Sequence, residues 1–124
     1  MSSDSITFEK RTESSTLKAT SVEFRDDVTV ITAQGDVGKY GAVYASFELS
    51  YNRDGDGGTV SGQGRGVVDR DTFFCEMFSS VWKRDESNLV MRNLVGISNG
   101  STSPDITVLN RAEKTLSADV YAIV

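Results

Sequence analysis

Apolar and polar residues alternate along most of this chain, most clearly between residues 40 and 69. Every second residue is apolar at Val43, Ala45, Phe47, Leu49 and Tyr51. This period of two is expected of a half-buried strand. After the tip NRDGDGG, a second alternating run carries Val60, Gly62, Gly64, Gly66 and Val68 on one face. The segment Tyr40–Asp69 is therefore predicted to form a long β-hairpin.

The glycines of the second run leave one face of that strand almost without side chains. Glycine is unfavourable inside a strand, so three at alternate positions indicate sharp curvature or the close approach of a bulky group. We expect large residues opposite these glycines. The predicted register has Tyr51 opposite Val60, Leu49, Phe47 and Ala45 opposite Gly62, Gly64 and Gly66, and Glu48 near Gln63 and Arg65.

A second hairpin is predicted from DTFFCEMFSSVWKR and LVMRNLVGIS, with its turn at residues 85–88. Pairing Arg84 with Leu89 gives a mostly apolar face with a few polar insertions. On that face lie Phe74, Glu76, Phe78, Ser80 and Trp82, together with Met91, Asn93, Val95 and Ile97.

Shorter strands are predicted at Ile6–Arg11, Leu17–Arg25, Val28–Gly35, Ile106–Leu109 and Leu116–Val124, because β-branched and aromatic residues alternate there. The only proline, Pro104, is placed in a loop that begins at Asn99, because proline interrupts a central strand. The segment AEKTLSADVYA has helix-forming composition but is assigned as strand.

These elements predict an all-β fold in one domain, residues 1–124: an antiparallel meander closed into a barrel of about eight strands. Closure removes exposed sheet edges, and such a barrel has room inside for side chains or one small ligand. A two-sheet β-sandwich is the alternative.

Composition mainly excludes functions. The chain has 124 residues, no histidine, one cysteine and a net charge of -5. Nucleophile pairs that use histidine and histidine-ligated metal sites are therefore impossible. The acidic residues are spread evenly, which argues against nucleic acid as a partner. No apolar run reaches the ~20 residues of a membrane helix, and no secretory signal is recognisable. We expect a cytoplasmic protein without a membrane partner.

The long strands, the segment GTVSGQGRGVVD and the uninterrupted β pattern resemble the small calycin-type barrels, in particular the allene-oxide-cyclase-like barrels. The resemblance covers about Val28 to the C-terminus and includes no diagnostic catalytic motif. It implies a small apolar ligand in the barrel, in some members cyclised without a cofactor, and a homo-oligomer.

The mixed face of the second hairpin is the predicted ligand wall. We expect Phe78, Trp82, Met91 and Val95 to supply apolar contacts and Ser80 and Asn93 to orient the ligand, with Phe47, Tyr51 and Gly64 contributing from the first hairpin. Glu76 is the catalytic candidate, because desolvation inside a barrel would raise its pKa. The alternative is a filled core with Glu76 near a rim.

The tip residues Asn52, Asp54 and Asp56 have the spacing of a calcium-loop start, but Gln63 stands where the last glutamate ligand is needed. A hairpin turn explains the Asp-Gly pairs more simply, so no metal and no cofactor is predicted.

Two functions remain open. The first is a barrel that binds a small apolar molecule and acts as a cofactor-free cyclase or isomerase. The second is a non-catalytic barrel with a filled core, whose outward aromatics, among them Tyr44 and Phe73, form an oligomer interface or a partner surface. An open or filled interior between Phe47, Trp82 and Met91 is expected to separate them.

Overall fold

The computed structural model describes residues 7–10, 15–37, 41–69, 73–100 and 102–123. These residues form strands and connecting turns, with no helix among them. The strands are β1 (Phe8–Lys10), β2 (Ser15–Phe24), β3 (Val28–Asp36), β4 (Ala42–Ser50), β5 (Gly57–Val67), β6 (Phe73–Asp85), β7 (Asn88–Ile97), β8 (Thr102–Asn110) and β9 (Thr115–Ile123). The all-β prediction is confirmed.

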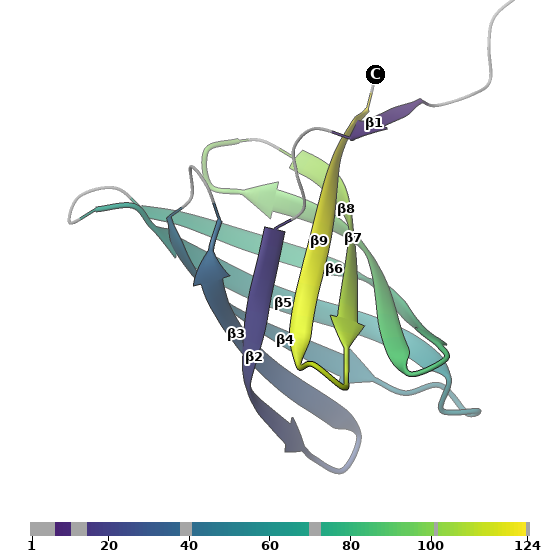
Figure 1. Ribbon diagram of the computed structural model, residues 1–124. Coiled ribbons are helices and arrows are strands. Elements are labelled where there is room, and N and C mark those ends of the chain that lie inside the picture. Colours follow the sequence, from purple (N-terminus) through teal and green to yellow (C-terminus); the bar gives the residue numbers. More distant parts are fainter. Residues whose placement is uncertain (1–6, 11–14, 38–40, 70–72, 101, 124) are drawn as a thin grey trace, which may run out of the picture.

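The strands from β2 to β9 form a closed antiparallel barrel (Figure 1). Each strand pairs with the next along the chain, and β9 closes the sheet by pairing with both β8 and β2. The short strand β1 adds to the outer part of β9, where Phe8 lies opposite Ile123. The predicted barrel of eight strands is therefore correct, and the sandwich alternative is wrong.

The register of the second predicted hairpin is confirmed. Arg84 lies opposite Leu89, and the pairing continues through Trp82 with Met91 to Phe78 with Val95. Glu86 has a positive φ in the short turn that joins β6 to β7. Lys114 has a positive φ in the turn that joins β8 to β9.

The register of the first hairpin is wrong by two residues. Leu49 rather than Tyr51 lies opposite Val60, which places Phe47 opposite Gly62 and Ala45 opposite Gly64. The reason is the position of the turn, which lies one residue earlier than predicted: the Asn52 amide donates to the Gly57 carbonyl at 2.7 Å, and Gly55 has a φ of +73°. The shift is an even number of residues, so the same side chains face the interior.

Strand β8 begins earlier than predicted. It starts at Thr102 and includes Pro104, which the sequence placed in a loop. Pro104 lies opposite Leu94 of β7, whereas pairing with β9 begins only at Asp105. Among the described residues, Pro104 therefore has a neighbouring strand on one side only, which is where a sheet tolerates proline.

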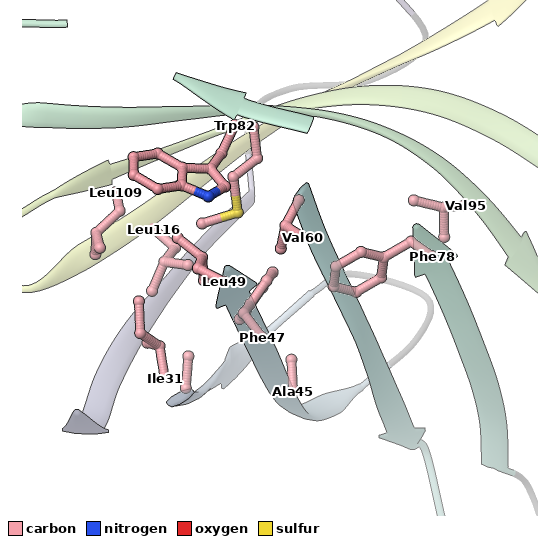
Figure 2. Packing of buried hydrophobic residues seen from close by; sticks show 12 residues of the cluster. Ile31, Ala45, Phe47, Leu49, Val60, Phe78, Trp82, Val95, Leu109 and Leu116 are labelled. Carbon is pink, nitrogen blue, oxygen red and sulfur yellow. The ribbon is translucent and has the colours of Figure 1, made fainter. Parts of the chain in front are cut away.

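One hydrophobic cluster fills much of the barrel (Figure 2). Met91 is fully buried, and Leu49, Val60 and Leu116 are each about 1% exposed. The strands of Leu49, Val60 and Met91 alternate more buried and more exposed positions, as expected for a sheet with one face inward. The core residues are Ile31, Ala33, Ala45, Phe47, Leu49, Val60, Phe78, Trp82, Met91, Val95, Leu109 and Leu116.

The described glycines of β5 permit close approach between strands. A Cβ atom at Gly62 would lie 2.3 Å from Cζ of Phe78 and 2.5 Å from the carbonyl oxygen of Ser46. At Gly58 it would lie 2.0 Å from the carbonyl oxygen of Ser50. The bulky group that approaches Gly62 is thus the protein's own Phe78, whose ring packs 5.1 Å from that of Phe47.

Replacing Gly62 with alanine should destabilise the barrel. The added methyl group has no room between the Phe78 ring and the backbone of β4, and overpacking of this kind costs about 1–3 kcal/mol. The free energy of unfolding, measured in urea, tests this. Gly96→Ala is the matched control, because a Cβ atom there would meet nothing closer than 4.0 Å and should leave stability unchanged or slightly higher. Equal effects of the two substitutions would contradict the close packing at Gly62.

Candidate functional site

One end of the interior, around Trp82, is filled with side chains. Phe47, Trp82 and Met91 are 5%, 3% and 0% exposed and belong to the same hydrophobic cluster. Figure 2 shows Trp82 close to Leu109 and Leu116. The indole N–H of Trp82 donates to the carbonyl oxygen of Ser50 at 2.7 Å, which satisfies its polar atom. We call this region the packed end.

A polar cluster of Ser80, Asn93, Asp105 and Thr107 lies next to the packed end, across β6, β7 and β8. Ser80 lies opposite Asn93 in the sheet, and Asn93 lies opposite Asp105. The Ser80 hydroxyl donates to Oδ1 of Asn93 at 2.9 Å, and Nδ2 of Asn93 donates to Oδ1 of Asp105 at 2.7 Å. The Thr107 hydroxyl also donates to Oδ1 of Asp105, at 3.1 Å. These bonds fix the orientation of the carboxyl group.

Asp105 is the group whose chemistry the fold changes most in this cluster. Partial burial raises the pKa of Asp105 above its usual value of 3.8, and the bonds from Asn93 and Thr107 offset part of that rise. Both donated bonds reach Oδ1, and no described residue donates to Oδ2. A partly buried carboxyl group with a raised pKa is a candidate for a functional site.

The interior is more accessible beside Asp105 than at the packed end. Asp105 itself is half-buried, and so are Val120 and Ala118, which lie opposite Asp105 and Thr107 on β9. Leu17 and Ala19 of β2 are half-buried as well. Leu116, Ala118 and Val120 occupy alternate positions on the inward face of β9, and Leu116 is buried. Burial thus decreases along the interior from Leu116 towards Val120.

The predicted ligand residues divide between these two regions. Phe47, Phe78, Trp82, Met91 and Val95 are buried core residues. Ser80 and Asn93 belong to the polar cluster. Tyr51 is 46% exposed at the margin, with its ring edge against Trp82 at 5.5 Å and its hydroxyl bonded to Thr29. Gly64 is buried between Ala45 and Glu76.

The catalytic candidate Glu76 is placed only by its backbone. It lies opposite Gly64 on β5 and Ile97 on β7, but its side chain is outside the described part of the structure. The same holds for the side chain of Phe73, which was predicted to contribute to an interface.

Sequence reasoning missed Asp105 and Thr107. Pro104 moved the expected start of the strand to Ile106, so Asp105 was assigned to a loop. A signal was present nonetheless, since Ser103, Asp105, Thr107 and Leu109 keep the period of two through the proline. Ser103, Thr107 and Leu109 are buried, at 4%, 4% and 5% exposure.

The hairpin tip uses its polar side chains to build the turn. Oδ1 of Asn52 accepts a hydrogen bond from the Gly55 amide at 2.9 Å, and Nδ2 of Asn52 donates to Oδ1 of Asp56 at 3.2 Å. Within the described residues, no three acidic or cysteine side chains are grouped so that they could hold a metal ion.

An open hollow of about 520 Å³ lies over β2, β3 and β4. Lys18, Gln34, Asp36 and Tyr44 contribute to its lining. It contains none of the predicted ligand residues. Because it is open to solvent and its lining mixes charged and apolar residues, we place the candidate site in the interior instead.

No protein-family model, curated protein or solved structure matches this chain. The likeness to calycin-type barrels therefore rests on the closed eight-stranded outline alone. In the described ranges, no helix is long and apolar enough to span a membrane.

The raised pKa of Asp105 predicts how stability depends on pH. Its protonated form is favoured in the folded state, so Asp105 contributes stability below pH 3.8 that is lost as the pH rises through its folded-state pKa. The comparison is with Asp105→Asn, which has a similar shape and no charge. The unfolding free energy of the wild type minus that of the variant should fall as the pH rises from about 3.8 through the folded-state pKa, and it should be constant at higher pH. A difference that rises with pH, or does not change, would contradict a raised pKa.

Proposed function

We propose that this barrel binds a small, mostly apolar molecule that carries a hydroxyl or amino group, with the polar cluster holding that group. The apolar part of the ligand would lie against Val120, Ala118 and Val95, and the polar group would donate to Oδ2 of Asp105. The observation that supports this most directly is the half-buried Asp105 carboxyl, whose Oδ1 is held by two donors.

The orientation of Asp105 supports the choice of ligand chemistry. Asn93 and Thr107 already donate to one oxygen, so the carboxyl is fixed before any ligand arrives, and preorganisation of this kind reduces the cost of binding. A ligand donor at Oδ2 would satisfy the remaining acceptor. A site built to accept a hydrogen bond discriminates against an analogue that lacks the donor.

The site also offers a route to catalysis. A cofactor-free cyclisation or isomerisation needs a group that exchanges a proton near neutral pH, and burial moves the pKa of Asp105 in that direction. We therefore add Asp105 to Glu76 as a candidate for proton transfer. The filled packed end would keep the substrate beside this carboxyl.

The second candidate function is a non-catalytic barrel that acts through its outer surface. The packed end favours it, because Phe47, Trp82 and Met91 fill the part of the interior that the sequence analysis expected to decide the question. On this proposal the polar cluster is a satisfied structural network.

Binding of cyclohexanol and cyclohexane, compared by NMR, tests the proposal. The two probes share a ring and differ in the hydroxyl group. In the wild type, both should shift the signals of Val120 and Ala118, and cyclohexanol should bind roughly tenfold more tightly, as expected for one additional hydrogen bond to a charged group. Asp105→Asn should reduce this preference for the alcohol.

The matched control is Asp119→Asn, which removes a carboxyl from the neighbouring position on β9, where Asp119 pairs with Lys10. It should leave the preference intact. If neither probe shifts the signals of interior residues, the filled structural barrel is favoured and the ligand proposal is wrong. If both bind equally, Asp105 is not the group that recognises the ligand.

A further inference from the structure

The hydrogen bonds of the polar cluster use up its side-chain donors. The Ser80 hydroxyl donates to Oδ1 of Asn93 at 2.9 Å. Nδ2 of Asn93 donates to Oδ1 of Asp105 at 2.7 Å and to the Thr107 hydroxyl oxygen at 3.3 Å. The Thr107 hydroxyl in turn donates to Oδ1 of Asp105 at 3.1 Å. Because a hydroxyl group has one proton to donate and a primary amide has two, every side-chain donor of the cluster is used within it.

The group that the cluster leaves open is an acceptor. Oδ1 of Asp105 receives two donors, whereas Oδ2 receives none from the described residues. A primary ammonium group has three donors and no acceptor, whereas a hydroxyl group has one donor and two acceptor lone pairs. A bound hydroxyl group would find no free side-chain donor in this cluster for its own lone pairs. A ligand group that only donates therefore fits the cluster better than a group that also accepts.

The distribution of charge favours the same kind of ligand. Every lysine and arginine in the described ranges is exposed, whereas Asp105 is half-buried. The neighbours of Asp105 across the sheet are Asn93 on β7 and Val120 on β9, and neither carries a charge. The ion pairs of the described residues join Lys10 to Asp119 and Arg25 to Glu23, and leave out Asp105. Since an unpaired charge inside a protein is unfavourable, a cation supplied by the ligand would stabilise this carboxylate.

We propose that the ligand of this interior carries a primary ammonium group, which donates to Oδ2 of Asp105. This inference rests on the proposed function, and it narrows the polar group of the ligand from a hydroxyl or amino group to a protonated amine. An aliphatic amine is protonated at neutral pH, as the side chain of lysine is. Its hydrogen bond to a carboxylate is charge-assisted, and such bonds are roughly twice as strong as those between neutral groups. Half-burial of Asp105 leaves the site partly hydrated, which limits the desolvation cost of the pair.

A comparison of three probes at neutral pH tests the proposal: cyclohexylammonium, cyclohexanol and N,N,N-trimethylcyclohexylammonium. All three contain the same ring, and binding is measured from the NMR signals of Val120 and Ala118. The wild type should bind cyclohexylammonium about tenfold more tightly than cyclohexanol, as expected for one close pair of opposite charges. The trimethylated probe has the same charge but no N–H group, so it should bind more weakly than cyclohexylammonium.

Asp105→Asn should reverse the order of cyclohexylammonium and cyclohexanol. The asparagine carbonyl oxygen can accept the bonds from Asn93 and Thr107, which leaves the asparagine NH2 group at the open position. That group is an uncharged donor, so it disfavours an ammonium group but can donate to the oxygen of cyclohexanol. Asp119→Asn is the matched control, because it removes the same charge from the neighbouring strand β9 and should keep the order of the wild type.

Failure of this inference can be told apart from failure of the proposed function. If cyclohexanol shifts the interior signals and cyclohexylammonium binds no more tightly, the interior holds a ligand but the ammonium inference is wrong. The inference is also wrong if the trimethylated probe binds as tightly as cyclohexylammonium, or if Asp105→Asn leaves the order of the probes unchanged. If no probe shifts the interior signals of the wild type, the proposed function is wrong and the inference fails with it. The wild-type comparison needs no substitution, so it decides the question even if a variant does not fold.

Discussion

The pairing of β9 with both β8 and β2 is the constraint on which the rest of this structure depends. It converts a meander into a closed barrel and separates an interior from solvent. Without it, Leu116, Ala118 and Val120 would lie on an open sheet, and Asp105 would face water and not a protein interior. The same pairing is short on the β2 side, where it covers only Ser15–Lys18. Closure therefore encloses the Asp105 carboxyl, although β9 pairs with only part of β2.

Side chains fill this interior unevenly, and the glycines of β5 are one reason. Gly62 receives the ring of Phe78, and Gly58 lets the Trp82 indole reach the carbonyl oxygen of Ser50. Large side chains of β6 thus pack against β5 at positions where glycine leaves room for them. Along β9, burial decreases from Leu116 to the half-buried Val120, and the polar cluster lies beside this transition. This arrangement resembles a ligand site with an apolar floor and a few oriented polar groups.

Period-two alternation predicted most of the fold, because each strand buries one face and exposes the other. It placed Phe47, Trp82 and Met91 correctly on the inward face and gave the right register for β6 and β7. It could not fix the register of β4 and β5, since a slip of two residues keeps every side chain on its face and only the turn at Asn52–Gly57 decides it. Asp105 was missed because the rule that proline ends a strand ignores positions with one neighbouring strand. Ser80 and Asn93 were singled out because they interrupt an apolar pattern, but the contact of Asn93 with Asp105 on β8 depends on long-range pairing that no local pattern shows.

The carbon-13 NMR signal of the Asp105 side-chain carboxyl, followed as a function of pH in the intact protein, tests the central claim most directly. That claim is that barrel closure holds this carboxyl in a partly dehydrated interior, oriented by Asn93 and Thr107. The account predicts a midpoint above the usual aspartate value of 3.8 that moves towards that value on unfolding in urea. A midpoint at or below 3.8 in the folded protein would mean that Asp105 is solvated or paired with a cation, and it would contradict the proposed site.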